Sequence, residues 1–198
     1  MRSGCVGAGL LMSVLAAPAA GAADLDIAPE APPAYSTARL FNEVRLGGFA
    51  HGVGNPERGT FDVNVEALTR RFDLIPTTDP FWKALAPRLH LGASINTAGL
   101  TSQGYIGLTW TYDVTQRIFV EGSLGGSVND GRTGYDAFTP YNRAKLGCHV
   151  LFRESASVGY RLTENWSVMA TVDHISNGTL CGLNRGLNNV GVRLGYSF

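Results

Sequence analysis

Apolar and polar side chains alternate with a period of two in eight separate stretches of the chain. The clearest is 166–176, where Trp166, Val168, Ala170 and Val172 share one face. Such alternation predicts β-strands with one apolar face, because successive side chains of a strand point to opposite sides. The predicted strands cover residues 42–50, 61–68, 89–96, 106–112, 118–128, 150–162, 166–176 and 189–198.

An even number of strands of about ten residues is typical of the smallest outer-membrane barrels. The last strand ends on an aromatic residue, Phe198, as the closing strand of such a barrel does. No stretch offers the roughly 20 consecutive apolar residues of a membrane-spanning helix, so the chain can cross a membrane only as a closed sheet. The sequence therefore predicts an all-β protein, an eight-stranded antiparallel transmembrane β-barrel over residues 39–198.

The first 38 residues read as targeting and lead-in segments. Arg2 precedes an apolar run at 6–17 and a cluster of small residues at 18–23. This order predicts a secretory signal peptide over residues 1–23. Residues 24–38 are rich in Pro and Ala and predict an extended periplasmic lead-in. We therefore expect the mature chain in the outer membrane of a Gram-negative bacterium.

Charged residues collect on the face opposite the apolar one. Net charge is zero and no basic run is present, so nucleic acid is not an expected partner. In a soluble sandwich these charges would form the solvated face, whereas in a narrow barrel they must pair inside the lumen. They are Glu43, Arg45, Asp62, Glu66, Glu121, Arg153, Arg161, Asp173 and Arg193.

The connections between strands give a direction to the barrel. If both termini are periplasmic, Cys148 and Cys181 fall at the same outer end. That placement favours a disulfide in an oxidising compartment, although two free thiols remain open. The connection 69–87 is long for a periplasmic turn, and Asp79 followed by Pro80 predicts a short helix there, with aromatic residues anchoring it at the inner interface.

His174 and Ser176 end the seventh strand on its otherwise apolar face. An imidazole there could take a proton from the neighbouring hydroxyl, although two polar residues at a strand end also suit a headgroup layer. The tight turn that pairs Leu162 with Trp166 places Glu154 beside His174. Asn188, just before the eighth predicted strand, also faces outward at the same height. A carboxylate, an imidazole and a hydroxyl that all face outward form a set of groups typical of the active site of a hydrolase.

Two segments then point to a family. His174-Ile175-Ser176-Asn177, followed by Asn184-Arg185-Gly186-Leu187, resembles the lipid A 3-O-deacylases of the PagL type. The resemblance implies Ser176 as the nucleophile and His174 as the general base. It also implies Asn177 as an oxyanion contributor, helped by the backbone amide of Asn177 or Gly178.

The chain departs from that family at one catalytic position. The best-known members have a glutamate where this chain has Asn188. An amide can orient an imidazole but cannot neutralise an imidazolium. Three interpretations remain open: Asn188 orients His174, Glu154 supplies the charge, or activity is low. Asp173 points into the lumen and is read as structural.

The resulting expectation is an outer-membrane serine esterase that removes an ester-linked acyl chain from lipid A, the anchor of lipopolysaccharide. Arg143 or Lys145 in an outer loop could meet lipid A phosphates. No cofactor is expected and no metal, because the four histidines fall on separate elements without ligand spacing (His51, His90, His149 and His174). Homodimerisation is left open. The alternatives are a non-enzymatic small barrel with a structural or adhesive role and a soluble lipocalin-like barrel.

Overall fold

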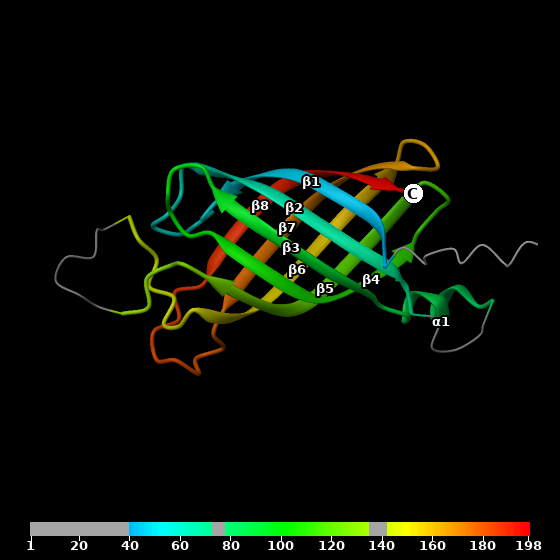
Figure 1. Ribbon diagram of the computed structural model, residues 1–198. Coiled ribbons are helices and arrows are strands. Elements are labelled where there is room, and N and C mark those ends of the chain that lie inside the picture. The colour runs from blue at the N-terminus through cyan, green and yellow to red at the C-terminus, as the bar shows by residue number, and fades with distance from the viewer. Residues whose placement is uncertain (1–39, 73–77, 135–141) are drawn as a thin grey trace, which may run out of the picture. The chain divides into compact units, whose positions relative to one another are not determined.

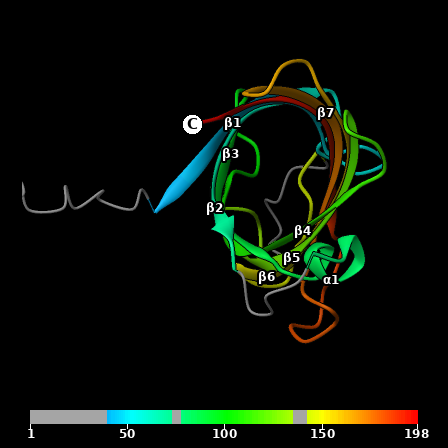
Figure 2. The same cartoon turned by 90° about the vertical axis from the view of Figure 1, so that its right-hand side faces the viewer.

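The computed structural model describes residues 40–72, 78–134 and 142–198, so the predicted signal peptide and lead-in lie outside the described residues. Eight antiparallel strands pair in chain order and close into a barrel, β8 pairing with β1 (Figures 1 and 2). The predicted fold class is confirmed. The strands are β1 (Phe41–His51), β2 (Thr60–Arg71), β3 (Arg88–Asn96), β4 (Gln103–Asp113), β5 (Ile118–Asn129), β6 (Val150–Arg161), β7 (Trp166–Ser176) and β8 (Leu187–Ser197).

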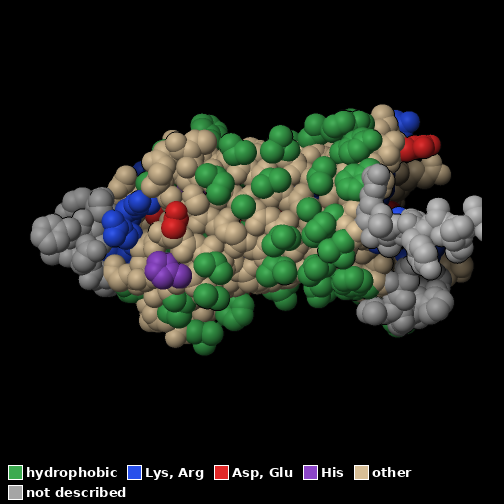
Figure 3. Space-filling model, viewed as in Figure 1, with side chains coloured by type: hydrophobic (Ala, Val, Ile, Leu, Met, Phe, Trp, Pro, Cys, Tyr) green, Lys and Arg blue, Asp and Glu red, His purple; other side chains and the backbone are tan. Residues whose placement is uncertain are grey.

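The outer wall of the barrel is apolar. Many large aliphatic side chains on the outward phase of the strands are more than half exposed, among them Leu46, Val150 and Val192. In Figure 3 apolar side chains are spread over the visible wall, and few charged side chains lie between the two ends. A continuous apolar band of this kind is stable against lipid and costly against water. No helix within the described ranges is long and apolar enough to cross a membrane.

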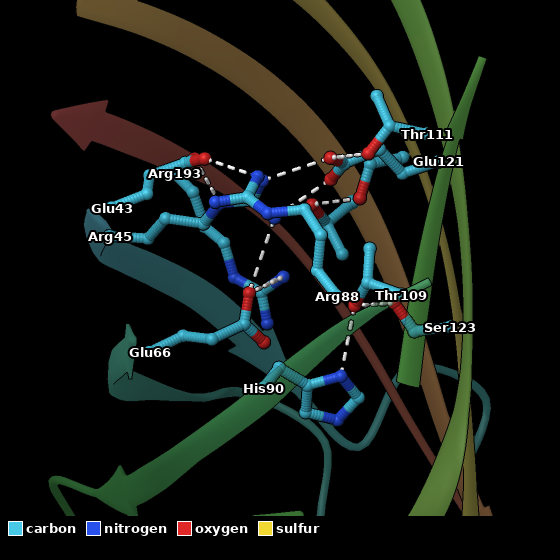
Figure 4. Close-up of polar contacts among 12 residues, drawn as sticks. Glu43, Arg45, Glu66, Arg88, His90, Thr109, Thr111, Glu121, Ser123 and Arg193 are labelled. Atoms are coloured by element: carbon cyan, nitrogen blue, oxygen red, sulfur yellow. Dashed lines mark hydrogen bonds and ion pairs between the residues drawn. The ribbon is translucent and has the colours of Figure 1, made fainter. Parts of the chain in front are cut away.

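The lumen is filled by paired charges, as predicted. Arg45 contacts three carboxylates from different strands, with Nε 2.6 Å from Glu43 Oε1 and Nη1 2.7 Å from Glu121 Oε2 and 3.2 Å from Glu66 Oε1 (Figure 4). Arg153 pairs with Asp173 in the same interior. Burial of these groups is tolerable because each charge has an opposite partner and several hydrogen bonds. The ion pair with Arg153 agrees with the structural role expected for Asp173.

The two ends of the barrel differ. One end, called the turn end here, holds the turns 114–117 and 162–165 and the C-terminus; the other, the loop end, holds the longer connections 52–59, 97–102, 130–149 and 177–186 (Figure 1). At the loop end a buried apolar cluster closes the barrel mouth. It consists of Ala144, Leu146, Leu151, Ile175 and Leu187. Cys148 and Cys181 form a disulfide across two of these loops, with Cα atoms 5.9 Å apart, so the predicted bridge is confirmed.

The predicted helix start in the connection between β2 and β3 is also confirmed. α1 (Pro80–Ala84) begins after Asp79, whose carboxylate accepts the Phe81 amide hydrogen at 2.8 Å. Phe81 and Trp82 remain at least half exposed. The helix lies at the turn end (Figure 1). Its role as an aromatic anchor at the inner interface stays a prediction.

Candidate active site on the outer wall of the barrel

β7 places His174 and Ser176 on the outer wall at the loop end. Their side chains are half-buried, while those of the intervening Asp173, Ile175 and Asn177 are buried. This alternation follows from the pleat of the strand, which sends every second side chain outward. The imidazole and the hydroxyl therefore face the surroundings of the barrel and not its lumen.

β6 brings Glu154 opposite His174 and Phe152 opposite Ser176. This is the register predicted from the tight turn, where Leu162 N donates to Trp166 O at 2.9 Å. Glu154 is exposed, and within the described part of the chain it forms no hydrogen bond or ion pair. The structure thus brings Glu154 beside His174 without joining the two side chains.

β8 supplies the partner that His174 does contact. Asn188 lies opposite His174, and its Oδ1 is 2.6 Å from His174 Nδ1. The Asn188 Nδ2 donates to Val53 O at 3.5 Å, and the Val53 amide donates to Asn188 O at 2.7 Å. Because Val53 O can only accept, the side-chain amide of Asn188 turns its oxygen toward the ring. This orientation makes Nδ1 the protonated ring nitrogen and leaves a lone pair on Nε2.

The second ring nitrogen of His174, Nε2, is without a hydrogen bond in the described part of the chain. Neither His174 Nε2 nor Ser176 Oγ has a hydrogen-bond partner among the described residues. Gly186 passes close to this edge: its φ is +60°, and a Cβ built on it would lie 3.0 Å from His174 Cε1. Glycine is required there both by the left-handed backbone and by the close approach. The serine hydroxyl and the imidazole are therefore not joined by a hydrogen bond in the described structure.

Asn177 does not occupy the position expected of an oxyanion donor. Its side chain is 2% exposed, and Nδ2 donates to Leu146 O at 2.7 Å and to Leu183 O at 2.5 Å. Its backbone amide donates to Asn184 Oδ1 at 2.9 Å. All three N–H groups are therefore engaged in holding the loop 177–186. These contacts do not favour direct donation from Asn177 to an oxyanion, and its predicted role there stays a prediction.

Gly178 is the remaining donor of the two that the sequence suggested. The Leu180 amide donates to Asn177 O at 3.1 Å, and both central residues of this turn have positive φ, 60° for Gly178 and 71° for Thr179. Two positive φ values characterise a type I′ turn. The Gly178 amide has no hydrogen-bond partner in the described structure, and the residue lies over the Phe152 ring beside Ser176. Thr179, a non-glycine residue in the left-handed region, marks local backbone strain next to the site.

A buried carboxylate connects the loops behind the site. Glu57 Oε2 is 3.0 Å from His51 Nε2, and the carboxylate accepts the amide hydrogens of Thr101 and Ala144 at 3.0 and 2.9 Å. Burial by itself would raise the pKa of Glu57, but hydrogen bonds from His51, Thr101 and Ala144 outweigh it and hold the pKa below its ordinary value of 4.5. The loop that contains Val53 is thereby fixed to its neighbours. Sequence reasoning did not find this connection.

The other residues considered at the sequence level lie apart from this site. His51 and His90 are buried in the barrel, bonded to Asp62 and Thr109 respectively. His149 contacts the Asn129 backbone oxygen. Over the described ranges, no three His, Cys, Asp or Glu side chains are grouped so as to hold a metal ion.

A closed eight-stranded barrel with an apolar outer wall defines an outer-membrane β-barrel as the class of protein. Residues 76–197 match the family model described as lipid A 3-O-deacylase (PagL), and the chain belongs to this family. It is therefore an outer-membrane enzyme, an ester hydrolase that acts on lipid A. The predictions of family, enzyme class and location are confirmed.

One solved structure supports the fold. The chain is similar to the crystal structure of the outer membrane enzyme PagL, with a TM-score of 0.59 and 15% identity over 79% of this chain and 99% of that one. A de novo designed transmembrane β-barrel gives a TM-score of 0.49 and 16% identity over 80% of this chain and 96% of the other. No curated protein matches the sequence.

Proposed function

We propose that Ser176 is the nucleophile and His174 the general base of a lipid A 3-O-deacylase in which Asn188 takes the place of the acidic third residue. The main support is the 2.6 Å contact between His174 Nδ1 and Asn188 Oδ1 on the outward face that also bears Ser176. This contact leaves Nε2 as the basic nitrogen of the ring, without a hydrogen bond to a described residue.

The reaction proceeds by acyl transfer and hydrolysis. The Ser176 oxygen attacks the ester carbonyl carbon while His174 Nε2 takes the hydroxyl proton. The tetrahedral intermediate collapses when the protonated ring gives that proton to the sugar oxygen, which leaves as a hydroxyl group. Water, deprotonated by the same nitrogen, then hydrolyses the acyl-serine and releases the fatty acid. The free Gly178 amide is the proposed donor to the oxyanion.

The wall beside the pair suits an acyl chain that is already in the membrane. Ala156 on β6 lies opposite Gly122 on β5 and Val172 on β7. These three outward residues form the cross-strand row next to the one that contains Glu154 and His174. A Cβ at Gly122 would contact nothing within 4 Å, so little side-chain bulk covers this part of the wall. The substrate needs no entry into the lumen, because the ester can approach from the leaflet that surrounds the barrel.

The loop end is proposed to face the cell exterior, where lipid A resides. Outer-membrane barrels have short periplasmic turns and longer extracellular loops, which matches the turn and loop ends described above except for the long connection between β2 and β3 that contains α1. All proposed site residues come from one chain, so the proposal requires one copy, and the homodimer left open by the sequence is not needed for it. The neutral amide of Asn188 predicts slower turnover than a carboxylate would give.

Mass spectrometry of extracted lipid A tests the proposal. We expect that expression of the wild-type protein in an outer membrane removes one ester-linked hydroxyacyl chain. Ser176→Ala and His174→Ala should leave lipid A intact although the barrel folds. Ser197→Ala, which removes a hydroxyl at the opposite end of the barrel, is the matched control and should retain activity. Deacylation by Ser176→Ala would refute the assignment, and an unmodified profile with wild type would favour a non-enzymatic barrel.

A further inference from the structure

A second polar feature lies at the loop end, on the surface beside the proposed catalytic residues. It is a cavity of about 360 Å³ formed by the loops that follow β1, β5 and β7, and we call it the headgroup cavity. It is lined by Gly54, Asn55, Pro56, Arg58, Asn142 and Arg185.

The headgroup cavity has an unbalanced positive charge. Arg58 and Arg185 are exposed, and neither guanidinium has a hydrogen bond or ion pair with a described residue. The lining includes no acidic side chain. Glu57, adjacent in sequence, is fully buried and directed to His51 and to the two neighbouring loops. Two unpaired guanidinium groups at one cavity supply the positive charge and the N–H donors that a phosphate group binds.

The headgroup cavity shares its loops with the proposed active site. Asn55 Nδ2 donates to Gly186 O at 2.5 Å, and Gly186 is the residue that passes close to the His174 ring. Arg185 directly precedes Gly186, and Val53, on the same loop as Arg58, contacts Asn188. A group held in the cavity would therefore lie against the backbone that borders the catalytic imidazole.

We propose that the headgroup cavity binds a phosphate group of the lipid A sugar headgroup and so positions the ester at Ser176. This inference rests on the proposed function and names Arg58 and Arg185 as substrate-positioning residues. Lipid A is a phosphorylated glucosamine disaccharide, so its phosphates and its ester-linked chains share one compact headgroup. Arg143, suggested for this role by its position in the sequence, is instead engaged: its Nη2 donates to Gly99 O at 3.0 Å and its Nη1 lies 3.9 Å from Glu57 Oε1.

Steady-state kinetics on two forms of the substrate test the inference. Lipid A with its phosphates and the same lipid A after dephosphorylation are compared in detergent micelles. For the double variant Arg58→Gln/Arg185→Gln we expect KM on phosphorylated lipid A to rise about tenfold, because each lost contact to an exposed phosphate costs roughly threefold in affinity. kcat should change little, and KM on dephosphorylated lipid A should equal that of wild type.

Two controls test whether the effect is specific to the headgroup cavity and to lipid A. Arg117→Gln removes the same charge from an exposed arginine at the turn end and should leave KM unchanged. Phosphatidylglycerol added to the micelles tests a different source of phosphate: if it inhibits wild type but not the double variant, the cavity accepts phospholipid headgroups in general and the assignment to lipid A is wrong. Mobility of unheated samples in SDS gels verifies that every variant is folded.

The possible failures are distinguishable. If the double variant has the wild-type KM on both substrates while Ser176→Ala is inactive, the headgroup cavity has no part in substrate binding and only the further inference fails. If wild type releases no acyl chain from either substrate, the proposed function fails and the inference fails with it.

Discussion

Replacement of the Asn188 amide by a carboxylate probes the support of His174 directly. Asn188→Asp nearly preserves the shape of the side chain and keeps an oxygen about where Oδ1 now lies, 2.6 Å from His174 Nδ1. A hydrogen bond from the protonated ring to a carboxylate is about 1 kcal/mol more stabilising than a hydrogen bond from the same ring to a neutral amide oxygen. Because Asn188 is exposed, water screens the new charge and the gain does not exceed this value. About 1 kcal/mol corresponds to roughly fivefold in rate.

The assay is kcat for lipid A deacylation as a function of pH in detergent micelles. For Asn188→Asp we expect kcat to rise about fivefold across the pH range in which the wild-type protein is active. Asn188→Leu has a similar volume but no acceptor, so the ring loses its fixed tautomer and kcat should fall about tenfold. Wild-type kcat in Asn188→Leu, or a decrease in Asn188→Asp, would refute the proposed role of this residue.

Three further changes test separate parts of the mechanism and the fold. Glu154→Gln should change kcat by less than about twofold, because the carboxylate has no contact with the ring; a tenfold loss would assign the supporting charge to Glu154 instead. Gly122→Phe should raise KM for long-chain esters but not for short-chain ones. Gly104→Phe, at an equally open outward position three strands from β7, is the control and should raise neither KM. Equal effects of the two substitutions would mean that the acyl chain does not lie on this part of the wall. The lowered pKa of Glu57 means that its ionised form stabilises the fold, fully above about pH 4.5 and progressively less as pH falls through the lower folded value. Glu57→Gln should therefore lower the thermal unfolding temperature at pH 7, and the difference from wild type should shrink below pH 4.5; a constant difference across this range would contradict that reasoning.

The strand pattern was readable from the sequence because a barrel in lipid preserves a strict two-residue period on its outer wall. The register of β6 against β7 was also predictable, since a short turn fixes which outward residues face each other. The pattern failed where small or polar residues face outward. β4 begins at Gln103 and not at 106, because outward Gly104 has no side chain to mark the alternation.

The contacts across the closing pair of strands were not predictable from local sequence. Pairing of β1 with β8 brings Val53 to Asn188, although the two residues are far apart in the chain and no turn joins their strands. The motif around Ser176 suggested Asn177 as an oxyanion donor, whereas contacts to Leu146 and Leu183 direct its amide into the loop. Such contacts depend on how distant loops fold over the barrel mouth, and no short sequence pattern reports them.

Covalent trapping of the nucleophile tests the central claim most directly, namely that Ser176 on the outer wall is activated by His174. Folded protein in detergent is treated with a long-chain alkyl fluorophosphonate, and the modified peptide is sequenced by mass spectrometry. We expect one added phosphonyl group, located on Ser176, and no labelling of Ser176→Ala or of folded His174→Ala. Labelling at another residue, or absence of labelling in a preparation that deacylates lipid A, would contradict the claim.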